Sequence, residues 1–208
     1  GVHDHGFNNL STYGNLLRLM HEGKIPHNEW EAHFYSLAIQ ISGAVQASRW
    51  THLPEGGFIC SFNGPHSLFV DTIRSCRILV ASHLMGHSLH GEGDRKISLL
   101  ERALQHIEAT AKYSIYYGEG RDHYDIWGRT AHETIFNTND GQFRCPNAQQ
   151  GYTGFSTWTR GLAWGMLGFA EELEALELVN NDELTALGGF DKIEEMMLKG
   201  AKATCDFY

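Results

Sequence analysis

Four stretches of the chain carry apolar residues at helical spacing. In residues 28–50 the apolar side chains recur every three or four positions, which is the period of an amphipathic helix. The same period runs through residues 95–117, where Asp94 is the expected N-cap, and through residues 157–178 and 191–206. These stretches predict long helices joined by short loops, an arrangement typical of packed helical hairpins.

Three further stretches complete the pattern. Residues 67–85 are apolar on nearly all sides and follow a turn signal, so we expect a helix buried between neighbours, and a shorter helix at residues 10–21. Residues 124–151 alternate apolar and polar positions around an Asn-Asp-Gly turn at Asn139–Gly141, which indicates a small β-hairpin. The predicted fold is therefore mainly α with a short β insertion.

Composition narrows the class of protein. The chain has 208 residues with 25 acidic and 16 basic side chains, and 42% of its residues are hydrophobic. A core of good size can form, and the acidic balance disfavours binding to nucleic acid. The longest apolar runs are too short to cross a bilayer, so no membrane partner is expected. The four cysteines are widely separated and are expected to be reduced, buried small residues.

Two carboxylates stand where their chemistry is unusual. Asp71 lies within the apolar run 68–73, where an ionised carboxylate is costly unless it is paired or catalytic. It is either a core carboxylate bonded to a neighbouring helix or a general acid whose pKa is raised by its surroundings. Asp4 lies in a polar cluster beside a glycine and an aromatic residue. It can cap a helix, form part of a pocket rim, or do both.

The densest polar and aromatic signal is the segment 149–164, which enters the helix predicted over residues 157–178, with Ser156 or Thr157 as its expected N-cap. Tryptophan faces stack on sugar rings and an arginine pairs with a carboxylate, so the segment suits an acidic carbohydrate. Alternatively, Trp158 and Trp164 are core residues and Arg160 forms an ordinary helix salt bridge.

A metal site is a minority alternative. His3, Asp4 and His5 are close in sequence and are residue types that bind zinc or iron. The other histidines form no second cluster in sequence, so the favoured reading has no metal and no cofactor.

Three motifs resemble those of the unsaturated glucuronyl hydrolases, glycoside hydrolase family 88. They are His3-Asp4-His5-Gly6-Phe7, Val70-Asp71-Thr72, and Gln150-Gly151-Tyr152 followed by Ser156-Thr157-Trp158-Thr159-Arg160-Gly161-Leu162-Ala163-Trp164. The resemblance spans residues 1–169. The related unsaturated rhamnogalacturonyl hydrolases, family 105, share part of the pattern, but the residues around Gln150 and Ser156 favour family 88.

The resemblance implies an (α/α)6 toroid of helical hairpins and an enzyme. Its partner would be an oligosaccharide released by a polysaccharide lyase, from whose non-reducing end it removes the unsaturated 4-deoxy-uronic acid by hydrating the C4=C5 vinyl ether. Asp71 matches the acid–base carboxylate and Asp4 the assisting aspartate. His132, Gln150, Arg160 and Trp164 match substrate-binding positions. A binding protein of the same fold without catalysis, and a metal-dependent hydrolase, are the competing hypotheses.

The length changes the domain prediction. Six hairpins need at least roughly 200 residues, and comfortably more with a β insertion. The pattern predicts only about six helices, so we expect residues 1–208 to hold about half of a single catalytic domain, incomplete at both ends, with apolar helix faces exposed.

Overall fold

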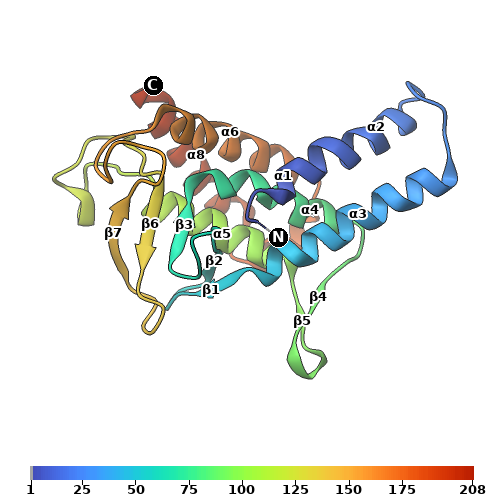
Figure 1. The fold of residues 1–208 in the computed structure, drawn as a ribbon, viewed down its shortest axis with the longest axis horizontal. Coiled ribbons are helices and arrows are strands. Elements are labelled where there is room, and N and C mark those ends of the chain that lie inside the picture. The colour runs from blue at the N-terminus through green and yellow to red at the C-terminus, as the bar shows by residue number, and fades with distance from the viewer. Residues whose placement is uncertain (1) are drawn as a thin grey trace.

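The computed structural model describes residues 2–208; Gly1, the first residue of the predicted domain, lies outside the described residues. The chain is mainly helical, with a three-stranded sheet at one end and two short hairpins elsewhere (Figure 1). The α-helices are α1 (His5–Asn9), α2 (Asn15–His21), α3 (Glu29–Ser48), α4 (Cys76–Leu84), α5 (Leu99–Tyr113), α6 (Thr159–Leu176), α7 (Asn181–Ala186) and α8 (Phe190–Phe207). The π-helix η1 (Leu10–Gly14) joins α1 to α2, and the 3₁₀-helices are η2 (Val70–Ser75), η3 (Glu92–Asp94) and η4 (Gly120–Asp122). The strands are β1 (Trp50–His52), β2 (Gly57–Ile59), β3 (Ser67–Phe69), β4 (Leu89–His90), β5 (Lys96–Ile97), β6 (Glu133–Phe136) and β7 (Phe143–Asn147).

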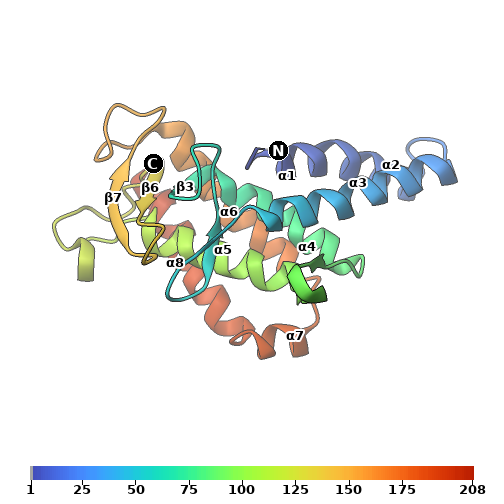
Figure 2. The same cartoon turned by 60° about the horizontal axis from the view of Figure 1, so that its bottom comes forward.

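Helix α4 is central to the core. It packs against α3, α5 and α6, and the main hydrophobic cluster forms around it. Helices α1 and α2 run back along α3, while α7 and α8 close the opposite side against α5 and α6 (Figure 2). The close approach of α3 to α4 depends on Gly43, because a Cβ atom there would lie 2.5 Å from the Cβ of Ser82.

A small antiparallel sheet lies at one end of the helices. Its strand order is β3-β6-β7, and β6 and β7 form the predicted hairpin around the Asn-Asp-Gly turn. Pairing of Leu68 with Thr134 brings β3 beside β6, so the hairpin is joined to the segment that precedes Asp71. Two other hairpins, β1-β2 and β4-β5, are separate from this sheet, and β4-β5 projects away from the body (Figure 1).

The expectation of one helix over residues 67–85 is wrong in its first half. Residues Ser67–Phe69 form strand β3, Val70–Ser75 form a 3₁₀-helix, and the α-helix begins only at Cys76. The apolar run is buried on all sides whether it is strand or helix, so periodicity could not separate the two. Asp71 therefore lies in a tight 3₁₀ turn.

Two predicted N-caps are also wrong. Helix α5 begins after Ser98, whose hydroxyl accepts from the Glu101 N–H, whereas Asp94 lies in the β4-β5 turn with φ of 58°. Helix α6 begins after Trp158, and the Thr157 hydroxyl instead accepts from the Thr130 N–H.

The long helices otherwise fall where the pattern places them. Helix α3 is capped by Asn28, whose side chain accepts from the N–H groups of Trp30 and Glu31. Its large apolar side chains, however, face outward: Trp30 is 74% and Phe34 60% exposed.

Of the four free cysteines, Cys76 is buried, Cys60 is half-buried, and Cys145 and Cys205 are exposed, so burial of all four was a wrong expectation. Within residues 2–208, each helix is too short or too polar to span a bilayer.

Candidate active site

Asp71 lies in η2, where the chain turns from strand β3 into helix α4. The Val70 N–H donates to the His132 carbonyl oxygen at 3.0 Å, which extends the β3-β6 pairing to the residue before Asp71. Val70, Thr72 and Ile73 are buried, whereas 16% of the Asp71 side chain remains exposed. These buried neighbours anchor the 3₁₀ turn, and the Asp71 carboxyl is the more exposed group within it.

Two imidazoles face the Asp71 carboxyl. His3 Nε2 lies 3.1 Å from Oδ2, and His132 Nε2 lies 3.8 Å from Oδ1. Oδ1 is almost completely shielded from solvent and has no hydrogen-bond partner among residues 2–208. Of the two Asp71 oxygens, Oδ2 therefore has a hydrogen-bond partner, whereas Oδ1 has only the more distant His132 ring beside it.

The protonation of His132 follows from its neighbours. The N–H groups of Gln149 and Gln150 both donate to His132 Nδ1, each at 3.2 Å, so the ring hydrogen is on Nε2. Burial lowers the pKa of His132, and the carboxylates of Asp71 and Glu133 act in the opposite direction. A neutral ring with its N–H toward Asp71 is the result.

The segment carrying Asp4 is fixed against η2 and α4. Gly6 makes this contact, because a Cβ atom there would lie 2.9 Å from both Ile78 Cγ2 and Ser75 Cβ. Asp4 occupies the N-cap position of α1, but its side chain makes no capping hydrogen bond with the described residues. Its Oδ1 atom is shielded from solvent and likewise unpaired within residues 2–208.

The two histidines beside Asp4 serve different partners. His3 faces Asp71, whereas His5 Nδ1 lies 2.8 Å from the Ser42 hydroxyl on α3. Within the described part of the chain, no three His, Cys, Asp or Glu side chains come together as a metal site would require. The arrangement therefore gives no support to the metal alternative at His3, Asp4 and His5.

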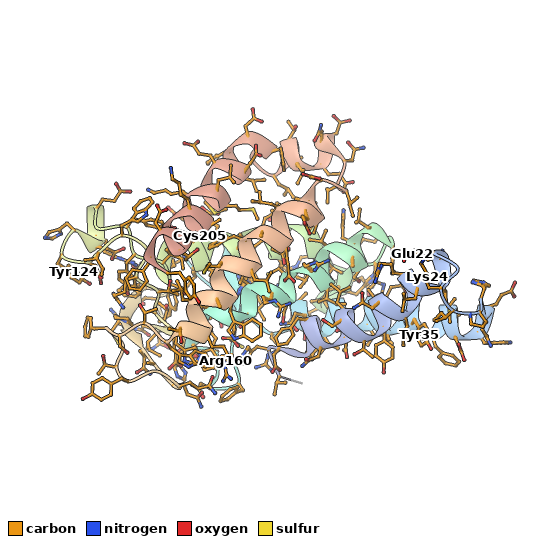
Figure 3. The ribbon with its side chains drawn as sticks, turned by 90° about the horizontal axis from the view of Figure 1, so that it is seen from above. Glu22, Lys24, Tyr35, Tyr124, Arg160 and Cys205 are labelled. Carbon is orange, nitrogen blue, oxygen red and sulfur yellow. The ribbon has the colours of Figure 1, made fainter. Side chains whose placement is uncertain are left out.

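Residues of the third motif pack next to His132. The Trp158 ring lies 4.7 Å from the His132 ring, and the Arg160 guanidinium lies 4.5 Å above Trp158. Arg160 is in the first turn of α6 and is exposed (Figure 3). Gln150 is exposed in the preceding loop and contacts His132 through its backbone N–H. His132 thus contacts both Asp71 and the Gln150 backbone, and Trp158 connects its ring to Arg160.

Trp164 belongs to an adjoining cluster. Its ring lies 5.7 Å from Phe7, which follows Asp4 in α1, and the Arg74 guanidinium lies 4.8 Å above it. Arg74 is one turn beyond Asp71 and binds both oxygens of Glu171 at 3.0 Å. A pocket of about 180 Å³ opens beside this cluster, lined by Phe7, Leu10, Ser11, Gly14, Asn15, Arg18, Arg74, Arg77 and Glu171.

Sequence reasoning missed some of the groups nearest Asp71. His3 entered it as a possible metal ligand and as part of the first motif, but not as a partner of Asp71, to which its ring is hydrogen-bonded. Phe69 packs its ring against both His3, at 5.0 Å, and His132, at 4.6 Å. Phe69 reads as an ordinary core residue in the apolar run, so no signal in the sequence could have identified it. The signal available for His3 was its position directly before Asp4 in the first motif.

Comparison with known proteins bears on the fold. A scan against models of protein families finds no match, and a search of curated proteins finds none either. Among solved structures, an unsaturated glucuronyl hydrolase specific for heparin matches with a TM-score of 0.68 and 18% identity, covering 99% of this chain and 44% of that one. The enzyme of Bacillus sp. GL1 is described as responsible for the degradation of glycosaminoglycan. It matches with a TM-score of 0.60 and 21% identity, covering 97% of this chain and 45% of that one. The unsaturated glucuronyl hydrolase of Streptococcus agalactiae matches with a TM-score of 0.61 and 18% identity, covering 95% of this chain and 42% of that one.

These matches confirm the predicted resemblance at the level of the fold. The chain spans less than half the length of each of these solved structures.

Proposed function

We propose that this chain is the part of an unsaturated uronyl hydrolase that carries its acid–base carboxylate. Its substrate would be an oligosaccharide with an unsaturated 4-deoxy-uronic acid at the non-reducing end, and no cofactor is required. The chain's helices would form about half of an (α/α)6 ring. The observation that carries the proposal is the Asp71 carboxyl, which is held by His3, faces a second imidazole and keeps one oxygen unpaired.

The chemistry assigned to Asp71 is proton transfer to carbon. Asp71 donates its proton to C4 of the C4=C5 double bond, which leaves positive charge shared between C5 and the ring oxygen. Water then adds at C5 and returns a proton to Asp71, so the carboxyl is regenerated. The resulting hemiketal opens by breaking the bond between C5 and the ring oxygen, and the hemiacetal at C1 releases the remaining sugar as an alcohol. The net reaction consumes one water.

Asp4 is assigned the second carboxylate role. Its Oδ1 is unpaired among the described residues, so the group is not committed to capping α1. An ionised carboxylate near an oxocarbenium-like centre lowers the energy of the charge that develops there. Asp4 would therefore orient the substrate and stabilise this intermediate, while Asp71 moves the proton.

The substrate-binding role is assigned to the motif beside His132. The Arg160 guanidinium is exposed next to Trp158 and matches the planar geometry of a uronate carboxylate. The half-buried Trp164 offers an aromatic face for a sugar ring. One further solved match, with a TM-score of 0.55 and 21% identity, is described as UGL with dGlcA-Glc-Rha-Glc, which is an oligosaccharide of the proposed kind. It covers 82% of this chain and 40% of its own.

The decisive experiment follows the double bond itself. We expect the ultraviolet absorbance of the conjugated uronate to fall when the chain is incubated with unsaturated disaccharides from lyase digests of heparin, chondroitin, gellan and pectic polymers. Asp71→Asn should reduce this rate by about 100-fold or more, because general acid–base catalysis contributes about 10²–10⁴. Asp140→Asn, in the β6-β7 turn, removes a carboxyl away from the site and should keep wild-type activity.

Other outcomes of this assay are equally informative. Undiminished turnover by a folded Asp71→Asn protein would remove Asp71 from the mechanism. Saccharide binding without loss of absorbance would show a carbohydrate-binding protein. Preference for the pectic digest would show the rhamnogalacturonyl specificity of family 105.

A further inference from the structure

His3 donates the hydrogen bond to Asp71 and is itself held by several contacts. The residue is 3% exposed, and its ring packs against Phe62 at 5.5 Å and Phe69 at 5.0 Å. Its carbonyl oxygen accepts from Gln46 Nε2 at 2.6 Å and from the Ser75 hydroxyl at 2.8 Å. Both the ring and the backbone of His3 are thereby fixed relative to η2, which carries Asp71.

The hydrogen bonds of the ring define its tautomer. The Phe62 N–H donates to His3 Nδ1 at 3.3 Å, so Nδ1 is an acceptor. The ring hydrogen of neutral His3 is then on Nε2, which lies 3.1 Å from Asp71 Oδ2 and donates to it. His3 thus connects a backbone N–H of the loop after β2 to the carboxyl of Asp71.

We propose that His3 is a positioning residue, which orients the Asp71 carboxyl and favours its ionised form through the Nε2–H bond. The inference rests on the proposed function and extends it to a residue for which no role in the reaction had been assigned. An N–H donor stabilises a carboxylate more than a neutral carboxyl. It also fixes the rotation of the carboxyl, and proton transfer to carbon is sensitive to such geometry.

Other titratable groups surround the pair and contribute to its electrostatic environment. They are Asp4 and His5 on the N-terminal segment, His106 on α5, His132 and Glu133 at β6, and Arg160 on α6. Burial lowers the pKa of His106 to about 3, so this imidazole is neutral at working pH. His106 is also fully buried, and its Nδ1 accepts the Ile59 N–H at 3.0 Å. It is a matched control for the loss of a buried imidazole.

Two amides separate the two hydrogen bonds of His3. In His3→Gln the amide nitrogen reaches the position of Nε2 and can still donate to Asp71. In His3→Asn the shorter amide reaches only the position of Nδ1, where it can accept from Phe62 but cannot reach Asp71. A role confined to the Phe62 bond predicts that Asn is tolerated and Gln is harmful, whereas positioning of Asp71 predicts the reverse.

The experiment compares His3→Gln, His3→Asn and His106→Asn for kcat, KM and the pH profile of kcat/KM. We expect His3→Asn to lower kcat on the order of 10- to 100-fold with little change in KM. It should also shift the limb of the profile due to Asp71 to higher pH. His3→Gln should recover most of kcat and the wild-type limb. His106→Asn should lower the unfolding midpoint and leave the limb unchanged.

The result that overturns the inference is the opposite order, with an active His3→Asn and an impaired His3→Gln, or an equal loss in both with an unchanged limb. The proposed function would still stand in that case, because wild-type turnover tests it separately. If the wild type turns over none of the substrates, the proposed function fails. Titration of ¹³C-labelled aspartate carboxyls by NMR then decides for His3, since a higher Asp71 pKa in His3→Asn than in His3→Gln supports it and equal values refute it.

Discussion

Asp4 and Asn28 occupy the same kind of position and behave differently. Both precede the first residue of a helix, but only the Asn28 side chain accepts from the helix N–H groups. A cap that is formed contributes typically about 1 kcal/mol, so Asn28→Ala should lower the free energy of unfolding by that amount. Asp4→Asn should leave stability within about 0.5 kcal/mol and lower kcat, because the Asp4 carboxylate is assigned to the reaction.

Urea unfolding of the two variants, together with the absorbance assay, measures both effects. If Asp4→Asn instead loses as much stability as Asn28→Ala and keeps full turnover, then Asp4 is a structural residue of α1.

Glu172 is a buried carboxyl outside the candidate site. It is fully buried, and neither carboxyl oxygen has a hydrogen-bond partner in the described chain. Burial raises its pKa well above the usual value; Arg77 opposes this, and Glu171 adds to it. Since the folded pKa lies above the unfolded one, this group favours folding at pH below the unfolded pKa. That contribution is lost as the pH rises through the folded pKa.

Glu172→Gln removes this pH dependence. We expect the variant and the wild type to be similar in stability near pH 4, and the variant to be about 1–3 kcal/mol more stable at pH 8, where burying the charge is most costly. Urea unfolding at the two pH values measures the difference. Glu174→Gln, an exposed position in the same helix, is the control. A gain that is equal at both pH values would mean that Glu172 does not titrate in this range.

What could be predicted at this scale depended on residue type. Asp71 was identifiable because a carboxylate in an apolar run is unusual, and Arg160 because it stands among aromatic residues. The environment of Asp71 could not be predicted, because it is built by contacts between residues far apart in the sequence. His3 and His132 are 68 and 61 positions away from it, the second separation being the difference between 132 and 71.

Glycines determine how α6 lies against η2. A Cβ atom on Gly168 would lie 2.2 Å from Ile73 Cγ2, whereas one on Gly165 would meet Val70 Cγ2 at an ordinary 3.5 Å. Gly168→Ala therefore has to push η2 away, and we expect a loss of about 1–3 kcal/mol together with lower activity. Gly165→Ala should be neutral or stabilising, since alanine gains up to about 1 kcal/mol in helix propensity. Thermal unfolding and kcat of both variants measure this, and equal behaviour would show that η2 adapts freely.

Element boundaries were harder to predict than element existence. The amphipathic period identified α3, α5, α6 and α8 because apolar residues recur along each of them at the helical spacing. It could not identify β3, since a strand paired with β6 and covered on both faces shows the same continuous apolar run as a buried helix. The 3₁₀ turn that carries Asp71 is a consequence of this strand, so the local geometry of the candidate site depended on pairing with a segment far along the chain.

One face of the molecule exposes large apolar side chains that are usually buried in a core. The apolar stripe of α3 faces outward, with Trp30, Phe34, Leu37, Ile41 and Val45 between 38% and 74% exposed. Meanwhile the buried positions of the same helix include Ser42, Gly43 and Gln46. This exposure agrees with the expectation of uncovered apolar helix faces. A contiguous apolar stripe is typical of a surface that another element or molecule covers.

We therefore expect the 208-residue chain, prepared alone, to self-associate through α3. Phe34 lies in the middle of the stripe, and burying a phenylalanine side chain contributes about 1.5–3 kcal/mol. Phe34→Lys should weaken self-association by about tenfold or more without disturbing the helix, because lysine is the better helix former. Sedimentation velocity measures the monomer fraction, and binding of a hydrophobic dye measures the exposed surface. Leu178→Lys adds the same charge at an apolar residue, 72% exposed, that follows α6, and should change neither. A wild-type chain that stays monomeric and binds no dye would show that the apolar stripe of α3 does not drive association.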